Sequence, residues 1–243
     1  MRYAQSNHPS CHPERSEGSP GLLRTTHGAL RITNMDLTSE HFESVGLTIW
    51  QPSKGHRYGS ESLALAAFCE LSPHERVVEF GSGVGVISLV LAAKNQLREI
   101  VSIEIQGMLH EIALKNVREN ECGAIVRCVH GDFRNFSKKN RQIFDVVVTN
   151  PPFYSAGNGR LPADAQRAAA RHELSGTLSE LLEAAKRVLR PQGRLAMVFK
   201  NDRYDELVGD ASSLGFEKIR DDGEGGSDFF LVEFLLHEKK VSR

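Results

Sequence analysis

Short apolar segments alternate with amphipathic ones from residue 76 onward, and this alternation constrains the fold more than any other feature of the chain. Helical patterns stand between the apolar segments, over 86–95, 108–120 and 177–189. Neighbouring parallel strands need long crossover connections, usually helices, so the pattern predicts a mostly parallel α/β sheet with helices on both faces. The apolar segments that we interpret as its first five strands are 76–80, 100–105, 124–132, 144–149 and 191–200.

The last part of the sequence departs from this alternation. A helical pattern over 203–215 ends at Gly215, and two strand patterns follow at 216–222 and 228–238, with a glycine-rich segment between them. Two strands joined by so short a loop form a hairpin. We therefore expect a seven-stranded, mostly parallel sheet whose last strand is antiparallel.

The first part is less regular. Residues 1–34 are rich in Ser, His, Pro, Gly and Arg without any period, and such a segment buries too little apolar surface to offset its ordering entropy. We expect 1–34 to be a disordered or spurious extension, and the folded domain to span 35–243. Within that domain, 46–51 is predicted as a short strand and 60–71 as a helix capped by its first residue, a serine.

Composition limits the classes of function. The chain has 243 residues and a formal net charge of -1, so binding to nucleic acid would need a local basic patch. Its four cysteines suggest neither a zinc site nor a disulfide framework, as in a protein of the reducing cytoplasm. No apolar run reaches the roughly 18 residues that span a bilayer, and the N-terminus lacks the apolar core of a secretory signal. We expect a cytoplasmic monomer that binds no metal and no membrane.

A glycine-rich loop follows the first strand of the alternating region. Ligands of open α/β sheets bind at the carboxyl ends of strands, where glycines let the backbone approach the ligand closely. Val86 stands where the dinucleotide fingerprint requires a third glycine, and the carboxylate of Glu79 would repel a phosphate. The loop therefore predicts a site for a cationic or amino-bearing ligand, formed by Gly81, Gly83 and Gly85.

Two further carboxylates end the next two strands. Glu104 stands where a carboxylate can accept hydrogen bonds from both hydroxyls of a ribose, and Asp132 could accept one from an adenine amino group. The order of these pieces along one rim resembles that of the class I S-adenosylmethionine-dependent methyltransferases, a Rossmann-like fold whose usual sheet has seven strands with the last one antiparallel. The resemblance implies S-adenosylmethionine as the cofactor, and it assigns Ile105 and Phe133 to the same site.

The fourth strand ends in Asn-Pro-Pro-Phe. This matches a motif of methyltransferases that act on amino groups, in which Asp, Asn or Ser precedes two prolines and an aromatic residue. The resemblance implies that Asn150 and Pro151 accept hydrogen bonds from an exocyclic amine, through a side-chain and a backbone oxygen, and direct its lone pair at the sulfonium methyl. Pro152 helps to fix this backbone, and Phe153 offers the base a stacking face worth about 1–3 kcal/mol.

Two flanking segments narrow the resemblance. The stretches at 51–68 and 170–199 are similar to the bacterial methyltransferases that modify the N(6) amino group of adenine next to the anticodon of valine tRNA. The likeness covers about residues 46–237, and it departs from the family pattern at His56 and Tyr58, which replace the usual Tyr and Phe. It implies that the anticodon loop of a tRNA is the substrate.

Basic residues near the motif are predicted to contact RNA. The loop 154–173 follows the catalytic motif, and loops of this length in compact domains are often binding segments. Positive side chains there and before the glycine loop would form the local patch that the net charge does not reveal. These side chains are Lys54, Arg57, Arg160, Arg167, Arg171 and His172.

Other interpretations stay open at this point. The Asn-Pro-Pro motif also occurs in enzymes that methylate a glutamine of release factors and in guanine-N(2) methyltransferases of ribosomal RNA, although those usually carry a large additional N-terminal domain. A non-catalytic RNA-binding module on the same fold is argued against by Glu104, Asp132 and Asn150. A nicotinamide-dependent reductase is disfavoured by Val86 and by the lack of a recognisable Tyr-Lys catalytic pair.

Overall fold

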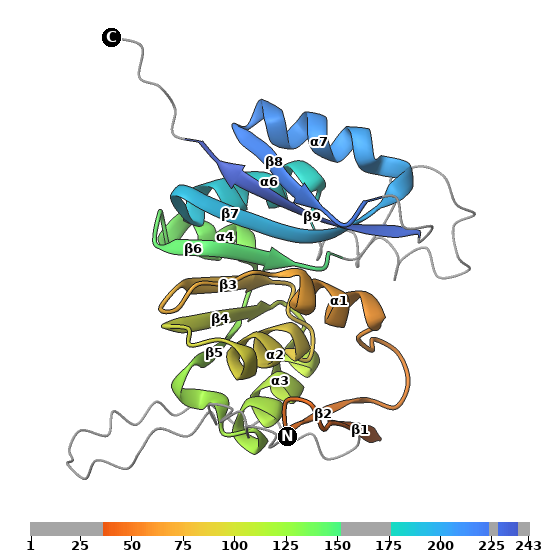
Figure 1. Ribbon diagram of the computed structural model, residues 1–243. Coiled ribbons are helices and arrows are strands. Elements are labelled where there is room, and N and C mark those ends of the chain that lie inside the picture. The colour runs from red at the N-terminus through yellow and green to blue at the C-terminus, as the bar shows by residue number, and fades with distance from the viewer. Residues whose placement is uncertain (1–35, 152–175, 224–227, 238–243) are drawn as a thin grey trace, which may run out of the picture.

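The computed structural model describes residues 36–151, 176–223 and 228–237. The remaining residues, drawn as a grey trace in Figure 1, lie outside the description. The predictions for 1–34 and for the loop 154–173 therefore stay predictions.

Seven strands form one sheet in the spatial order β5-β4-β3-β6-β7-β9-β8 (Figure 1). The five strands from β3 to β7 run parallel, and β9 runs antiparallel to both of its neighbours, β7 and β8. The predicted mostly parallel sheet with an antiparallel last strand is confirmed. Its strands are β3 (Arg76–Phe80), β4 (Glu99–Glu104), β5 (Val126–His130), β6 (Phe144–Thr149), β7 (Leu189–Lys200), β8 (Phe216–Asp221) and β9 (Phe229–Leu236).

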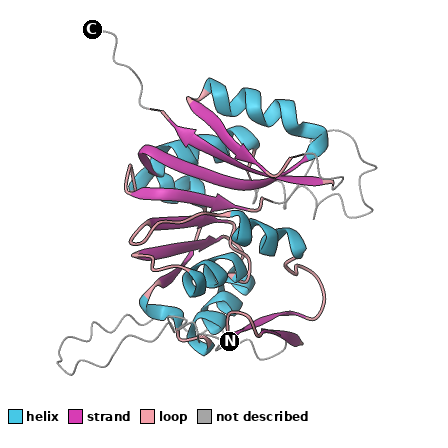
Figure 2. Cartoon of the chain, viewed as in Figure 1, coloured by secondary structure: helices cyan, strands magenta, loops and turns pink. Residues whose placement is uncertain are grey.

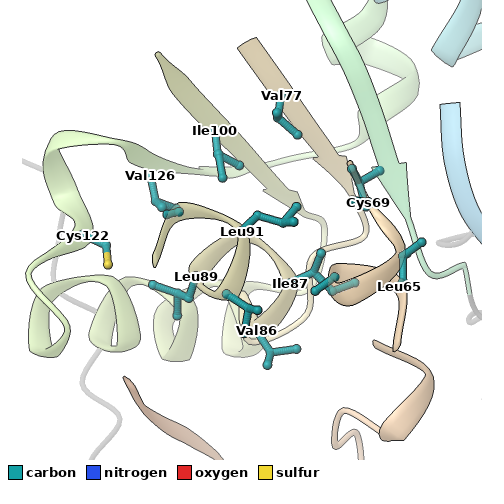
Figure 3. Close-up of a cluster of buried hydrophobic side chains, with 14 of the residues drawn as sticks. Leu65, Cys69, Val77, Val86, Ile87, Leu89, Leu91, Ile100, Cys122 and Val126 are labelled. Carbon is teal, nitrogen blue, oxygen red and sulfur yellow. The ribbon is translucent and has the colours of Figure 1, made fainter. Parts of the chain in front are cut away.

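Helices cover both faces of this sheet (Figure 2). Successive strand residues point to opposite faces, so Val77 enters one core and Val78 the other. Figure 3 shows the first core, in which side chains of α2 pack against those of the strands. One face carries α1 (Ser60–Phe68), α2 (Val86–Lys94) and α3 (Gly107–Glu119), and the other carries α4 (Phe133–Lys139), α6 (Leu178–Val188) and α7 (Tyr204–Ser213). Two short 3-10 turns complete the helical elements of the described residues, η1 (Cys122–Ala124) and η2 (Asn201–Arg203). None of the helices in the described ranges is long and apolar enough to cross a membrane.

A separate hairpin precedes the main sheet, formed by β1 (Leu37–Phe42) and β2 (Leu47–Pro52). The sequence predicted β2 but not β1. The backbone at the free edge of β2 is hydrogen-bonded to two side-chain amides, one in α3 and one at its C-cap. Asn116 exchanges hydrogen bonds of 2.8 and 2.9 Å with the backbone of Trp50, and the cap residue Asn120 exchanges two of 2.8 Å with that of Thr48. Because those amides are one helical turn apart, the hairpin lies along α3.

One local prediction was wrong, and one helix was not predicted. The cap of α1 is Gly59 rather than Ser60, which is the first helical residue, and no side chain in the described part of the chain caps this helix. The segment after β5, for which the sequence predicted no element, forms the helix α4. It is short and basic, and its start is stabilised by the carboxylate of Asp132, which accepts a 2.7 Å hydrogen bond from the backbone N–H of Arg134.

Candidate active site

A cavity of about 360 Å³ lies at the carboxyl ends of β3, β4 and β6. Its walls come from the loop after β2, the first turn of α1, the glycine loop and the strand ends. Pro152, Phe153, Arg160, Arg167, Arg171 and His172 lie outside the described residues. Of the predicted site residues that are described, Gly85, Asp132 and Lys54 do not line the cavity, whereas those that do are Arg57, Glu79, Gly81, Gly83, Glu104, Ile105, Phe133, Asn150 and Pro151.

Glu79 is buried next to the end of β3, with 2% of its surface exposed. Its carboxylate accepts hydrogen bonds from the backbone N–H of Ser88, at 3.1 Å, and from the Ser88 hydroxyl. Burial raises the pKa of Glu79 to about 8, and the bonds from Ser88 oppose that rise only in part. No cation among the described side chains contributes to this pKa. A positively charged group in the cavity would therefore favour the ionised form of Glu79 and lower this pKa.

Glu104 joins the end of β4 to the glycine loop. Its two oxygens accept hydrogen bonds from the backbone N–H groups of Gly83, at 2.8 Å, and Gln106, at 2.7 Å. Burial raises the pKa of Glu104, while these two donors oppose the rise, and His56 across the cavity also lowers it. Each oxygen keeps lone pairs for further donors, so this carboxylate is held in place yet can still accept hydrogen bonds from a ligand.

The three glycines of the loop all have left-handed backbone conformations, and two of them line the cavity. Gly81 and Gly83 line the cavity and have positive φ angles, 68° and 57°, which other residues rarely adopt. Gly85 lies behind them as the cap of α2, and a Cβ atom there would stand 3.4 Å from the Cβ of Ala113. Gly85 also has a positive φ angle, 83°, so the backbone at the start of α2 favours glycine there as well. Sequence reasoning missed Ser82, which lines the cavity and whose buried hydroxyl has no hydrogen-bond partner among the described groups.

The end of β6 presents Asn150 and Pro151 to the cavity. Thr149 fixes this strand end, because its buried hydroxyl donates a 3.0 Å hydrogen bond to the backbone carbonyl of Phe80 at the end of β3. The side-chain Nδ2 of Asn150 donates a 2.9 Å hydrogen bond to the Oγ atom of Ser62, a buried residue of α1 that the sequence did not single out.

Asp132 and Phe133 were predicted to belong to the same site, but only Phe133 lines the cavity. Phe133 lines the cavity and stacks on Phe80, with ring centroids 5.0 Å apart and planes 19° from parallel. The Asp132 carboxylate is instead occupied by Arg134, whose guanidinium lies 2.8 Å away. The contact between Asp132 and adenine therefore stays a prediction.

The outer wall of the cavity comes from the loop between β2 and α1. Arg57 donates hydrogen bonds of 2.7 Å to the hydroxyl of Thr38 and to the carbonyl of Pro52. The hydroxyl of Tyr58 donates one of 2.7 Å to the carboxylate of Glu40. Thr38 and Glu40 belong to β1, so the strand that the sequence did not predict holds this wall in position.

Comparison with known proteins agrees with this geometry. Residues 58–211 match the family model of the methyltransferase small domain. The chain belongs to the methyltransferase small domain family. It is thus a methyltransferase, and the site at the strand ends lies within the matched residues.

Curated relatives carry a more specific name. A protein of Bacteroides fragilis named tRNA1(Val) (adenine(37)-N6)-methyltransferase is 28% identical over 185 residues, which cover 76% of this chain and 77% of the relative. A protein of Tolumonas auensis with the same name is 29% identical over 187 residues, covering 75% and 77%. These names agree with the resemblance seen in the two segments that flank the motifs.

Solved structures share the fold. TYW2 of Pyrococcus horikoshii, in complex with MeSAdo, superposes with a TM-score of 0.58 at 14% identity, covering 83% of this chain and 72% of the other. TrmN of Thermus thermophilus superposes with a TM-score of 0.54 at 19% identity, covering 72% and 48%. The class I methyltransferase architecture expected from the sequence is confirmed.

Proposed function

We propose that this protein transfers a methyl group from S-adenosylmethionine to the N(6) amino group of the adenine next to the anticodon of valine tRNA, in the cytoplasm, through a domain spanning 35–243. The observation that carries this proposal is the position of Asn150 and Pro151, which line the same cavity as the buried carboxylates Glu79 and Glu104. The two residues proposed to accept hydrogen bonds from an amine thus line the same cavity as two carboxylates suited to a cationic cofactor.

The cavity fits S-adenosylmethionine in its chemistry. Glu79 and Glu104 are buried without a lysine or arginine partner among the described residues, which favours a ligand that brings its own positive charge. Glu104 would accept hydrogen bonds from the ribose hydroxyls, and the backbone at Gly81 and Gly83 leaves room for close approach. Ile105 and Phe133 would flank the adenine ring. When bound, the cofactor supplies a sulfonium methyl group to an attacking amine.

The chain's own contribution to the reaction is to orient that amine. An amino group on an aromatic base is a poor nucleophile because its lone pair is delocalised into the ring. Hydrogen bonds from its two N–H groups to Asn150 Oδ1 and to the Pro151 carbonyl would favour the pyramidal form and aim the lone pair. No general base is needed beforehand, since the surplus proton can leave to water after methyl transfer.

Recognition of tRNA is supported by the names of the relatives and by the basic side chains near the site. Arg57 lines the mouth of the cavity, and Lys54 is exposed in the same loop. We propose that they contact phosphates, together with Arg160, Arg167, Arg171 and His172, while Pro152 and Phe153 complete the binding of the base.

A direct test uses the purified protein with radiolabelled S-adenosylmethionine and three substrates: valine tRNA made by transcription, ribosomal RNA and a peptide release factor. We expect label in the tRNA, recovered as N(6)-methyladenosine by nucleoside mass spectrometry. The label should disappear when the adenine next to the anticodon is replaced by guanine. Label found only in ribosomal RNA or in protein would overturn the proposal.

A further inference from the structure

One buried contact connects α1 to the proposed catalytic motif. Three residues of α1 are buried, Ser62, Leu65 and Ala66, and Ser62 is the polar one among them. Ser62 is 5% exposed, and its Oγ atom accepts the 2.9 Å hydrogen bond from Asn150 Nδ2 across 88 residues of sequence. Both residues line the cavity.

This contact distinguishes the two ends of the Asn150 amide. A carboxamide has a donor NH₂ end and an acceptor oxygen, and a half-turn about its last side-chain bond exchanges them. The bond to Ser62 holds the NH₂ end on α1. No hydrogen bond from a described residue reaches Oδ1, so the oxygen is the end left for a ligand.

We propose that Ser62 is a positioning residue for methyl transfer: it holds the Asn150 amide with Oδ1 available to the substrate amine. The proposal rests on the role given to Asn150 under the proposed function. Without Ser62, the amide would also adopt the reversed orientation, which presents NH₂ hydrogens to the N–H groups of the substrate and accepts nothing from them.

The first experiment compares Ser62→Ala with Ser62→Thr, which keeps the hydroxyl, and with Ser60→Ala, which removes an exposed hydroxyl from the same helix. Methylation of transcribed valine tRNA is measured at varied concentrations of tRNA and S-adenosylmethionine. We expect Ser62→Ala to lower kcat about tenfold, as loss of one orienting hydrogen bond implies, with both KM values nearly unchanged. Ser62→Thr should restore much of kcat, and Ser60→Ala should match the original protein. A normal kcat for Ser62→Ala would overturn the proposal.

The second experiment separates positioning from a general loosening of α1. Aspartate at position 150 has two equivalent oxygens and needs no orientation, so adding Ser62→Ala to Asn150→Asp should change kcat by about twofold or less. An equal loss in both backgrounds would mean that Ser62 acts independently of Asn150, and would overturn the proposal. Asn150→Ala serves as the reference for the proposed function. If it stays active, the role of Asn150 fails; if it is inactive while Ser62→Ala is normal, only the present inference fails.

Discussion

Buried carboxylates occur in two regions of this molecule and are treated in opposite ways. Glu233 in β9 is 3% exposed and pairs with two guanidinium groups, at 2.7 Å from Arg194 and 2.8 Å from Arg220. Glu79 and Glu104 in the cavity are buried to the same degree, at 2% and 4% exposed. They accept hydrogen bonds from a serine and from backbone N–H groups, and no lysine or arginine of the described chain pairs with them.

The difference separates a structural charge from a functional one. Removing a carboxylate from water is costly, and the cost is offset in β9 by two arginines that also reach the connection between α1 and β3, at Glu70 and Glu75. In the cavity the cost is left partly uncompensated, and the pKa values of both carboxylates are raised as a result. A cationic ligand would supply the positive charge that these two carboxylates do not receive from a lysine or arginine of the described chain. Mutations in the two regions should therefore damage different properties.

The largest effect is expected for Asn150→Ala, beside the unpaired carboxylates. Turnover should fall about 10²- to 10³-fold, because the reacting amine loses an orienting acceptor. Cofactor affinity and the unfolding midpoint in urea should remain close to those of the original protein. A matching loss of cofactor affinity would show that Asn150 belongs to the binding of the cofactor instead.

In the paired region, Glu233→Ala should leave two arginines without their shared partner. We expect the free energy of unfolding, measured in urea, to drop by about 3 kcal/mol, while cofactor affinity stays normal in the folded protein. Glu217→Ala is the matched control, since Glu217 is an exposed residue of the neighbouring strand and pairs only with His237 among the described residues. Its effect should be below about 1 kcal/mol. Equal effects of the two variants would remove the distinction drawn for Glu233.

Glu104→Ala should weaken cofactor binding by about 1.5–3 kcal/mol, because charge-assisted hydrogen bonds are lost. Titration calorimetry with S-adenosylhomocysteine measures this. Glu99→Ala, at the other end of the same strand, should leave the affinity unchanged, since Glu99 pairs with Arg76 away from the cavity. Stability should fall less for Glu104→Ala than for Glu233→Ala, and the reverse order would contradict the comparison.

The last prediction concerns the dependence of stability on pH. The ordinary pKa of 4.5 applies to Glu79 in the unfolded chain, and burial raises the pKa to about 8 in the folded protein. The folded state therefore keeps a proton that the unfolded state releases, and this stabilisation, present at low pH, is lost as pH rises from 4.5 to about 8. Glu79→Gln should flatten the decline of unfolding free energy over that window by about 1 kcal/mol per pH unit. Parallel pH profiles for the two proteins would argue against this assignment.

The strand ends of the site could be predicted because they depend on local sequence. An apolar run followed by a polar or glycine-rich turn gave β3 and β6 with their correct bounds, and with them Glu79 and Asn150. β1 was missed because its residues are mostly exposed and contain no buried stripe, so partners elsewhere hold it as a strand.

Contacts between distant elements could not be predicted. Ser62 gave no signal beyond a polar residue on an otherwise apolar helix face, and its partner is 88 residues away. Asp132 was expected at the end of a strand, but β5 ends at His130, and the pairing of Asp132 with Arg134 depends on the start of a short helix that the sequence did not reveal. The ends of strands can thus be predicted approximately from sequence, whereas the hydrogen-bond and ion-pair partners of individual side chains cannot.

The position of β9 also governs the order in which the sheet can be completed. β8 precedes β9 in the chain but joins the sheet only through it, because β9 lies between β7 and β8. During synthesis, β8 therefore cannot join the sheet until β9, which follows it in the chain, has been made. A chain stopped before Phe229 would lose two strands from the sheet instead of one, and the hydrogen-bonding edge of β7 would stand open to other chains.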